Sequence, residues 1–154
     1  MPVWSNPATR GRARRLTRSS MARKTECYAD TGAFIAFLDR SDSYHGLFRR
    51  LFSNPPPLAT SALVLAEGHG WFLRRYDQRR ALEFLNFVDA LPALTIEEFD
   101  GGAVKAASRL LKKFADQKLT LADAHGLTMM SDRRITSCWS TDRHMTLTGA
   151  TLVT

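Results

Sequence analysis

Hydrophobic and polar positions along the chain alternate between two periods. After residue 25, short apolar runs read as buried strands, and longer segments with apolar residues every three or four positions read as amphipathic helices. The strands are predicted at 25–29, 57–60, 93–99, 134–140 and 150–154. The helices are predicted at 31–40, 43–52, about 61–76 with Ser61 as the cap, 78–91, from Asp100 onward and over 119–130.

This order of elements predicts the fold class. Strands that are separated by helices need crossover connections, and such connections give a mostly parallel sheet covered by helices. The pattern therefore indicates an α/β domain. The chain of 154 residues is long enough for one such domain, and it shows no internal repeat and no second domain.

Composition excludes some classes of protein. Apolar residues make up 44% and charged residues 24% of the chain, which is ordinary for a soluble globular protein. No apolar run approaches the ~18 residues that a transmembrane helix needs. Cys27 and Cys138 lie in apolar runs far apart in the sequence. They indicate reduced core thiols and a cytoplasmic protein.

Charge separates the first 24 residues from the rest. The net charge is +7, yet all of the excess lies before Thr25, and the remainder balances 15 basic against 15 acidic residues. Residues 1–24 are expected to be a disordered basic tail, and residues 25–154 form the domain. Three interpretations of the tail stay open: an upstream extension with Met21 as the true start, an arm that contacts RNA phosphates, or an organellar transit peptide.

Four acidic residues occupy unusual places. Asp30 and Asp142 follow the first and fourth predicted strands, where open α/β sheets bind ligands. Glu67 and Asp123 interrupt the apolar stripes of two predicted helices. Each alone could be a partly exposed acid or the partner of an arginine. Four such acids from four separate elements favour one joint site.

The chemistry of such a site follows from its oxygen atoms. Carboxylates at short range repel one another, which raises their pKa values, unless a cation lies between them. Oxygen ligands suit Mg²⁺ or Mn²⁺, and such an ion can activate water and stabilise a phosphorane. The sequence therefore predicts hydrolysis of phosphodiester bonds.

Sequence motifs around these acids resemble a known family. The motifs are Ala-Asp-Thr at 29–31, TSALVLAE at 60–67, the run DQKLTLADA at 116–124 and STDRHM at 140–145. Together they resemble the PIN-domain ribonucleases, and among these the VapC-type toxins of toxin–antitoxin pairs. The resemblance covers about residues 26–153, and its last two motifs are the specific ones.

The resemblance implies a three-layer α/β/α fold, an Mg²⁺- or Mn²⁺-dependent endoribonuclease, a homodimer and a cognate antitoxin. It also assigns roles. The acids that would bind the metal and catalyse are Asp30, Glu67, Asp123 and Asp142, with Thr31 and Ser140 as supporting hydroxyl groups. The sequence departs from the family at Met145, where an aromatic residue is usual, and at the helix glycines Gly68 and Gly70, which could let a dimer mate approach.

Several neighbouring residues have less certain roles. His69, His125 and His144 lie close to the acids in sequence, but an all-oxygen site suits Mg²⁺ better, so they are not expected to be ligands. Asp116 is expected to cap the helix that follows it. Arg143, Arg74 and Arg75 are candidate RNA contacts, with an ordinary solvated surface as the alternative.

Two other functions stay open at this point. The first is a catalytically inactive PIN-like module that binds RNA or protein, and the second is a housekeeping ribonuclease without an antitoxin. The sequence does not identify the RNA, because loops are recognised by shape and stacking that no short motif records.

Overall fold

A computed structural model describes residues 25–153. The basic tail, residues 1–24, and Thr154 lie outside these residues, and so do the three interpretations of the tail. Within residues 25–153, five strands form one fully parallel sheet in the order β3-β2-β1-β4-β5, as the alternation predicted. The strands are β1 (Cys27–Ala29), β2 (Leu58–Ser61), β3 (Leu94–Glu97), β4 (Ser137–Trp139) and β5 (Thr151–Leu152).

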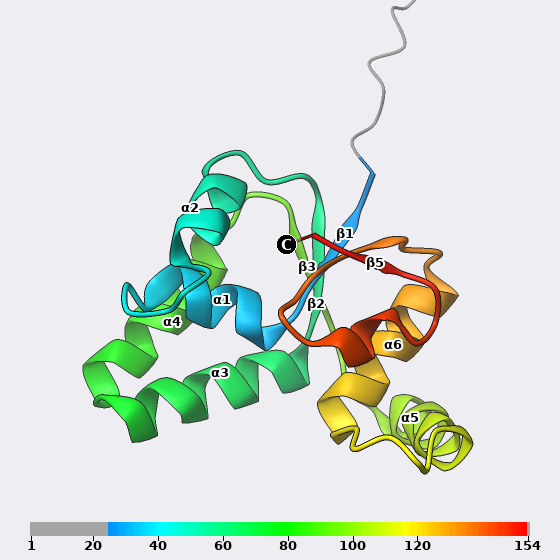
Figure 1. The fold of residues 1–154 in the computed structure, drawn as a ribbon. Coiled ribbons are helices and arrows are strands. Elements are labelled where there is room, and N and C mark those ends of the chain that lie inside the picture. Colours follow the sequence, from blue (N-terminus) through cyan, green and yellow to red (C-terminus); the bar gives the residue numbers. More distant parts are fainter. Residues whose placement is uncertain (1–24, 154) are drawn as a thin grey trace, which may run out of the picture.

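Six α-helices of the described residues cover the two faces of the sheet. Helices α1 to α4 lie on one side, and α5 and α6 lie on the other (Figure 1). This confirms the predicted three-layer α/β/α fold. No helix between residues 25 and 153 combines the length and apolar character that crossing a membrane requires. The helices are α1 (Thr31–Leu38), α2 (His45–Ser53), α3 (Ala62–Arg75), α4 (Gln78–Ala90), α5 (Gly101–Lys113) and α6 (Leu121–Asp132), and a 3₁₀ turn, η1, spans Arg143–Thr146.

Polar side chains cap four of these helices, and at α4 Asp77 accepts a hydrogen bond from the amide of Arg80. Ser61 Oγ accepts a hydrogen bond from the amide of Leu63, and Asp100 accepts one from the amide of Ala103. At α6, Thr120 and Asp123 form a reciprocal capping box. The prediction that Asp116 caps this helix is wrong, because Thr120 occupies the capping position. Asp116 is exposed and accepts a hydrogen bond from the side chain of Gln117.

The core contains the thiols and aromatic rings that the apolar runs predicted. Cys27 and Cys138 are free and buried. Gly68 is buried in α3 because the ring of Phe84, from α4, packs directly on its backbone. A Cβ atom at position 68 would lie 2.5 Å from Phe84 Cζ. The group that approaches Gly68 closely is therefore Phe84 of the same chain, and not a dimer mate.

This packing makes Gly68→Ala a destabilising substitution. We expect a loss of about 1–3 kcal/mol in the free energy of unfolding, because Phe84 is fully buried and cannot move aside. The measurement is urea unfolding of the purified protein. Gly46→Ala in α2 is the matched control, since a Cβ atom there meets nothing within 4 Å and should stabilise the helix slightly. Equal stability of the two variants would contradict the packing argument.

Candidate active site

The site lies where the order of strands reverses. The chain leaves β1 toward β2 and β3 on one side, and later returns to place β4 and β5 on the other. Ligands of open α/β sheets bind at such a point, outside the carboxyl ends of the strands. Asp30 follows β1 directly and Ser140 follows β4 directly. The amide of Asp30 donates to the carbonyl of Trp139 at 3.0 Å, so the two strand ends are held together.

Asp30 is the buried acid of the site. It is 8% exposed, and its Oδ2 accepts a hydrogen bond of 2.7 Å from Ser140 Oγ. The pKa of Asp30 is raised to about 6: burial raises it most, hydrogen bonds from Ser140 and the amide of Thr31 lower it, and the negative charges of Asp123 and Glu67 raise it. Half or more of this carboxylate is therefore ionised only above about pH 6.

Glu67 and Asp123 are more accessible than their positions on apolar stripes suggested. Glu67 is exposed on α3, and its Oε2 accepts a hydrogen bond of 2.9 Å from Thr31 Oγ1. Asp123 is half-buried in the first turn of α6, where Oδ2 accepts from the amide of Thr120 at 2.8 Å. A carboxylate in the first helical turn is also stabilised by the helix dipole.

Asp142 joins the group through Ser140. The amide of Asp142 donates to Ser140 Oγ at 3.0 Å, and the same hydroxyl donates to Asp30. The carboxylate of Asp142 caps η1, where it accepts from the amide of His144 at 2.9 Å and lies 3.0 Å from His144 Nδ1. Ser140 is thus the residue that connects the ends of two strands and two of the four acids.

The arrangement is acidic but is not a finished ligand cage. Asp123 and Glu67 lie close enough to Asp30 to raise its pKa. Among residues 25–153, however, no three His, Cys, Asp or Glu side chains are already placed to hold one metal ion. Glu67, Asp123 and Asp142 each accept a hydrogen bond from a nearby hydroxyl or amide. The carboxylate and hydroxyl oxygens of the site are ligand atoms of the kind that Mg²⁺ and Mn²⁺ bind.

Tyr28 and Gly126 bring α6 close to β1. Tyr28 lies two residues before Asp30 and therefore on the same face of the strand. Its buried hydroxyl has no hydrogen-bond partner and meets the backbone of α6 at Gly126, where a Cβ atom would overlap it. Gly126 follows Asp123 by about one helical turn. This pair was not among the predicted site residues, although its spacing from the two acids could have indicated it.

A comparison with protein families agrees with this geometry. The model of the PIN domain matches residues 27–148, which is most of the chain. The chain belongs to the PIN-domain family. The match covers all four acids, and it confirms the family that the motifs resembled. No curated protein sequence matches the chain.

Solved structures share the fold at low sequence identity. VapC20 of Mycobacterium tuberculosis, described as a toxin that cleaves the sarcin–ricin loop, is 22% identical, with a TM-score of 0.74 over 81% of this chain and 96% of that one. VapBC2 of Rickettsia felis, bound to promoter DNA, is 15% identical, with a TM-score of 0.56 over 84% and 98% of the two chains. A toxin–antitoxin complex from Klebsiella pneumoniae is 18% identical, with a TM-score of 0.55 over 83% and 96%.

His125 of this PIN domain makes structural contacts. His125 is buried on α6, where Nδ1 pairs with Ser61 Oγ at 2.7 Å and the ring lies 4.9 Å from that of Phe99. Burial lowers its pKa, so the ring is mostly neutral at pH 7. Met145, the departure from the family, is fully buried and packs toward Gly126. This departure therefore affects the packing of the core.

The buried carboxylate of Asp30 makes the stability of this PIN domain depend on pH. Because the folded pKa of Asp30 lies above its ordinary value of 3.8, ionisation is disfavoured in the folded state. The contribution of protonated Asp30 to the free energy of unfolding is therefore fully present below about pH 4, and it is lost as the pH rises through about 6. Asp30→Asn removes this loss. We expect the variant to exceed the wild type by up to about 3 kcal/mol at pH 8, and by little at pH 4.

The measurement is urea unfolding from pH 4 to pH 8 in EDTA, with wild type, Asp30→Asn and Asp116→Asn compared. Asp116→Asn is the matched control, because it makes the same chemical change at an exposed position. If Asp30→Asn gains no more stability at pH 8 than at pH 4, the carboxylate is not buried as described.

Proposed function

We propose that this chain is an Mg²⁺- or Mn²⁺-dependent endoribonuclease that acts as the toxin of a toxin–antitoxin pair in the cytoplasm. One observation carries the proposal. A carboxylate that is 8% exposed, with its pKa raised by burial and by two further acids, stands where the strand order reverses. A cation would relieve this repulsion, and such a costly group has little structural purpose. Membership of the PIN family supports a nuclease.

The four acids share one role in this proposal. Asp30, Glu67, Asp123 and Asp142 would hold the metal, with Asp30 at the centre because it is buried and fixed by Ser140. A bound ion would supply positive charge for the phosphodiester and lower the pKa of a water molecule. Ser140 would orient Asp30, and Thr31 would orient Glu67 through its hydroxyl. The accessible carboxylates would turn from their present donors toward the ion.

Partners belong to the same proposal. The neighbours in the Rickettsia and Klebsiella structures are toxin–antitoxin assemblies, which supports an antitoxin as the inhibitor of this chain. The homodimer is inferred from the family resemblance. The RNA substrate is inferred from the PIN fold, and because VapC20 is described as cleaving the sarcin–ricin loop, ribosomal RNA is the first RNA to test. Arg143, exposed beside Asp142, is a candidate contact to that RNA.

One observation favours a second candidate. The acids are engaged by local hydrogen bonds, and no three of them within residues 25–153 are positioned as metal ligands. A PIN-like module that binds RNA or protein without cleaving it would show the same arrangement. The two candidates differ in whether the acids bind a cation and whether RNA is cut.

Cleavage of RNA by the acid variants tests the first candidate. Asp30→Asn and Asp123→Asn should each reduce the rate more than about 100-fold, because they remove proposed metal ligands, and even residues that only support ligands change activity 10- to 100-fold. Ser140→Ala should fall within that smaller range. The measurement maps cut sites on total RNA with Mg²⁺ or Mn²⁺, with Asp116→Asn as the active control. Unchanged cleavage by Asp30→Asn, in a folded protein, would overturn the assignment.

Metal binding has a readout that is independent of cleavage. A ligand that binds only the folded state stabilises it, by about 2.7 kcal/mol at 100 times its Kd. We expect Mn²⁺ or Mg²⁺ at pH 8 to raise the Tm of wild type and of Asp116→Asn, but not that of Asp30→Asn. The measurement is thermal unfolding over a metal titration. A shift of the same size in Asp30→Asn would place the ion elsewhere, and no shift in wild type would favour the module that does not cleave.

A further inference from the structure

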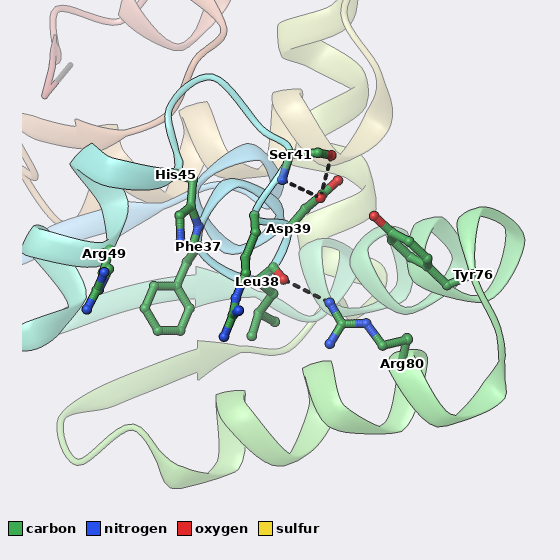
Figure 2. A pocket seen from close by; sticks show the side chains of 9 residues that line it. Phe37, Leu38, Asp39, Ser41, His45, Arg49, Tyr76 and Arg80 are labelled. Atoms are coloured by element: carbon green, nitrogen blue, oxygen red, sulfur yellow. Dashed lines mark hydrogen bonds between the residues drawn. The ribbon is translucent and has the colours of Figure 1, made fainter.

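A cavity lies away from the acids, at the end of α1 opposite Thr31. It has a volume of about 960 Å³ and lies between the end of α1, the start of α2 and the turn that joins α3 to α4. Figure 2 shows His45, Arg49 and Phe37 on one side of it and Tyr76 and Arg80 on the other. Its lining residues are Phe37, Leu38, Asp39, Arg40, Ser41, His45, Arg49, Tyr76 and Arg80.

Charge distinguishes this cavity from an ordinary surface hollow. Three guanidinium groups line it against one carboxylate, Asp39. That carboxylate is already satisfied, since its Oδ1 accepts from the amide of Ser41 at 3.0 Å and from its hydroxyl at 2.6 Å. Burial would raise the pKa of Asp39, but these hydrogen bonds and the charge of Arg75 lower it, so the group stays ionised. Because Asp39 has its own hydrogen-bond donors, the arginines of the cavity are left to attract an anion.

The arginines fall into two groups. Arg80 is fixed: it donates to the carbonyl of Leu38 at 2.9 Å, pairs with Glu83 at 2.6 Å and lies over the ring of Tyr76. Arg40 and Arg49 are exposed, and neither makes a salt bridge with any acid of residues 25–153. Two unpaired guanidinium groups at one cavity repel each other. A ligand with several negative charges would remove that repulsion.

We propose that this cavity binds backbone phosphates of a single-stranded RNA substrate through Arg40 and Arg49. The inference rests on the proposed ribonuclease function. Acids at the cleavage site repel RNA phosphates, so an RNA chain needs cations elsewhere along its path. Arginine suits this role because its planar fork matches the phosphate group. Phe37 and Tyr76 add aromatic rings of the kind against which bases pack.

The position of the cavity fits a chain that also reaches the acids. Helix α1 begins at Thr31, whose hydroxyl binds Glu67, and ends at Leu38, which lines the cavity. Its eight residues span about 12 Å. Helix α3 carries Glu67 and is followed directly by Tyr76 at the cavity. The two helices that hold groups of the active site therefore lead to the same cavity.

Binding of RNA at several salt concentrations tests this inference. The full chain is titrated in EDTA against a fluorescent single-stranded RNA of 20 nucleotides, and binding is followed by anisotropy. Arg40→Gln/Arg49→Gln should flatten the slope of log K against log salt by about 1.4, since each lost phosphate contact changes it by about 0.7. The control is Arg109→Gln/Lys112→Gln, which removes the same charge from exposed positions on α5, across the sheet.

The outcomes separate this inference from the nuclease proposal. A flatter slope in the cavity variant alone supports the cavity, even if wild type cuts no RNA with Mg²⁺. Equal slopes in the cavity variant, the control and wild type overturn it, even if all three cut RNA. Polyglutamate serves as a second probe. If it binds more tightly than RNA and only the cavity variant loses it, the cavity receives an acidic protein segment instead, and the RNA inference is wrong.

Discussion

The hydrogen bond from Ser140 to Asp30 is the interaction on which the rest of the site depends. It joins the carboxyl ends of β1 and β4 at the point where the strand order reverses, and it lowers the pKa of a carboxylate whose pKa burial raises. A buried ionised group costs several kcal/mol unless it is paired or hydrogen-bonded. The hydroxyl offsets part of this cost and fixes the direction of Asp30. The other acids are arranged around that fixed point.

Close packing explains how the other acids reach Asp30. Tyr28 fills the space beneath α6, and Gly126 lets the helix backbone meet its hydroxyl. This places the first turn of α6, with Asp123, above the end of β1. On the other face of the sheet, Thr31 begins α1 and binds Glu67 of α3. Glu67 and Asp123 are therefore positioned by the bulk of Tyr28, by the missing side chain of Gly126 and by the hydroxyl of Thr31.

Local signals in the sequence predicted most of the fold. Ser61 and Asp100 cap helices as their residue types suggested, because an N-cap needs only a short polar side chain and a few neighbouring amides. The beginning of β4 was predicted too early. After α6 the amides of Arg134 and Ile135 bond back to Ser131 and Met130, and Arg134 has a φ of 55°. This is the helix ending that glycine usually marks, so no residue type announced it.

The sequence predicted which acids form the candidate site but not how exposed each of them is. Spacing and strand ends predicted four acids as the site, and of these Glu67 is exposed and Asp123 is half-buried. An apolar stripe in the sequence does not tell which of its positions the neighbouring elements cover. Contacts between distant segments, such as Tyr28 with Gly126 or Ser61 with His125, depend on how elements pack and have no local signal.

Charge is also distributed unevenly over the described residues. The described residues are balanced in total, but four of the acids lie where the strand order reverses, and Arg40 and Arg49 line a cavity at the far end of α1. A polyanion that must approach acids is held best by cations a short distance away, because there they attract its phosphates without neutralising the carboxylates that a metal ion needs.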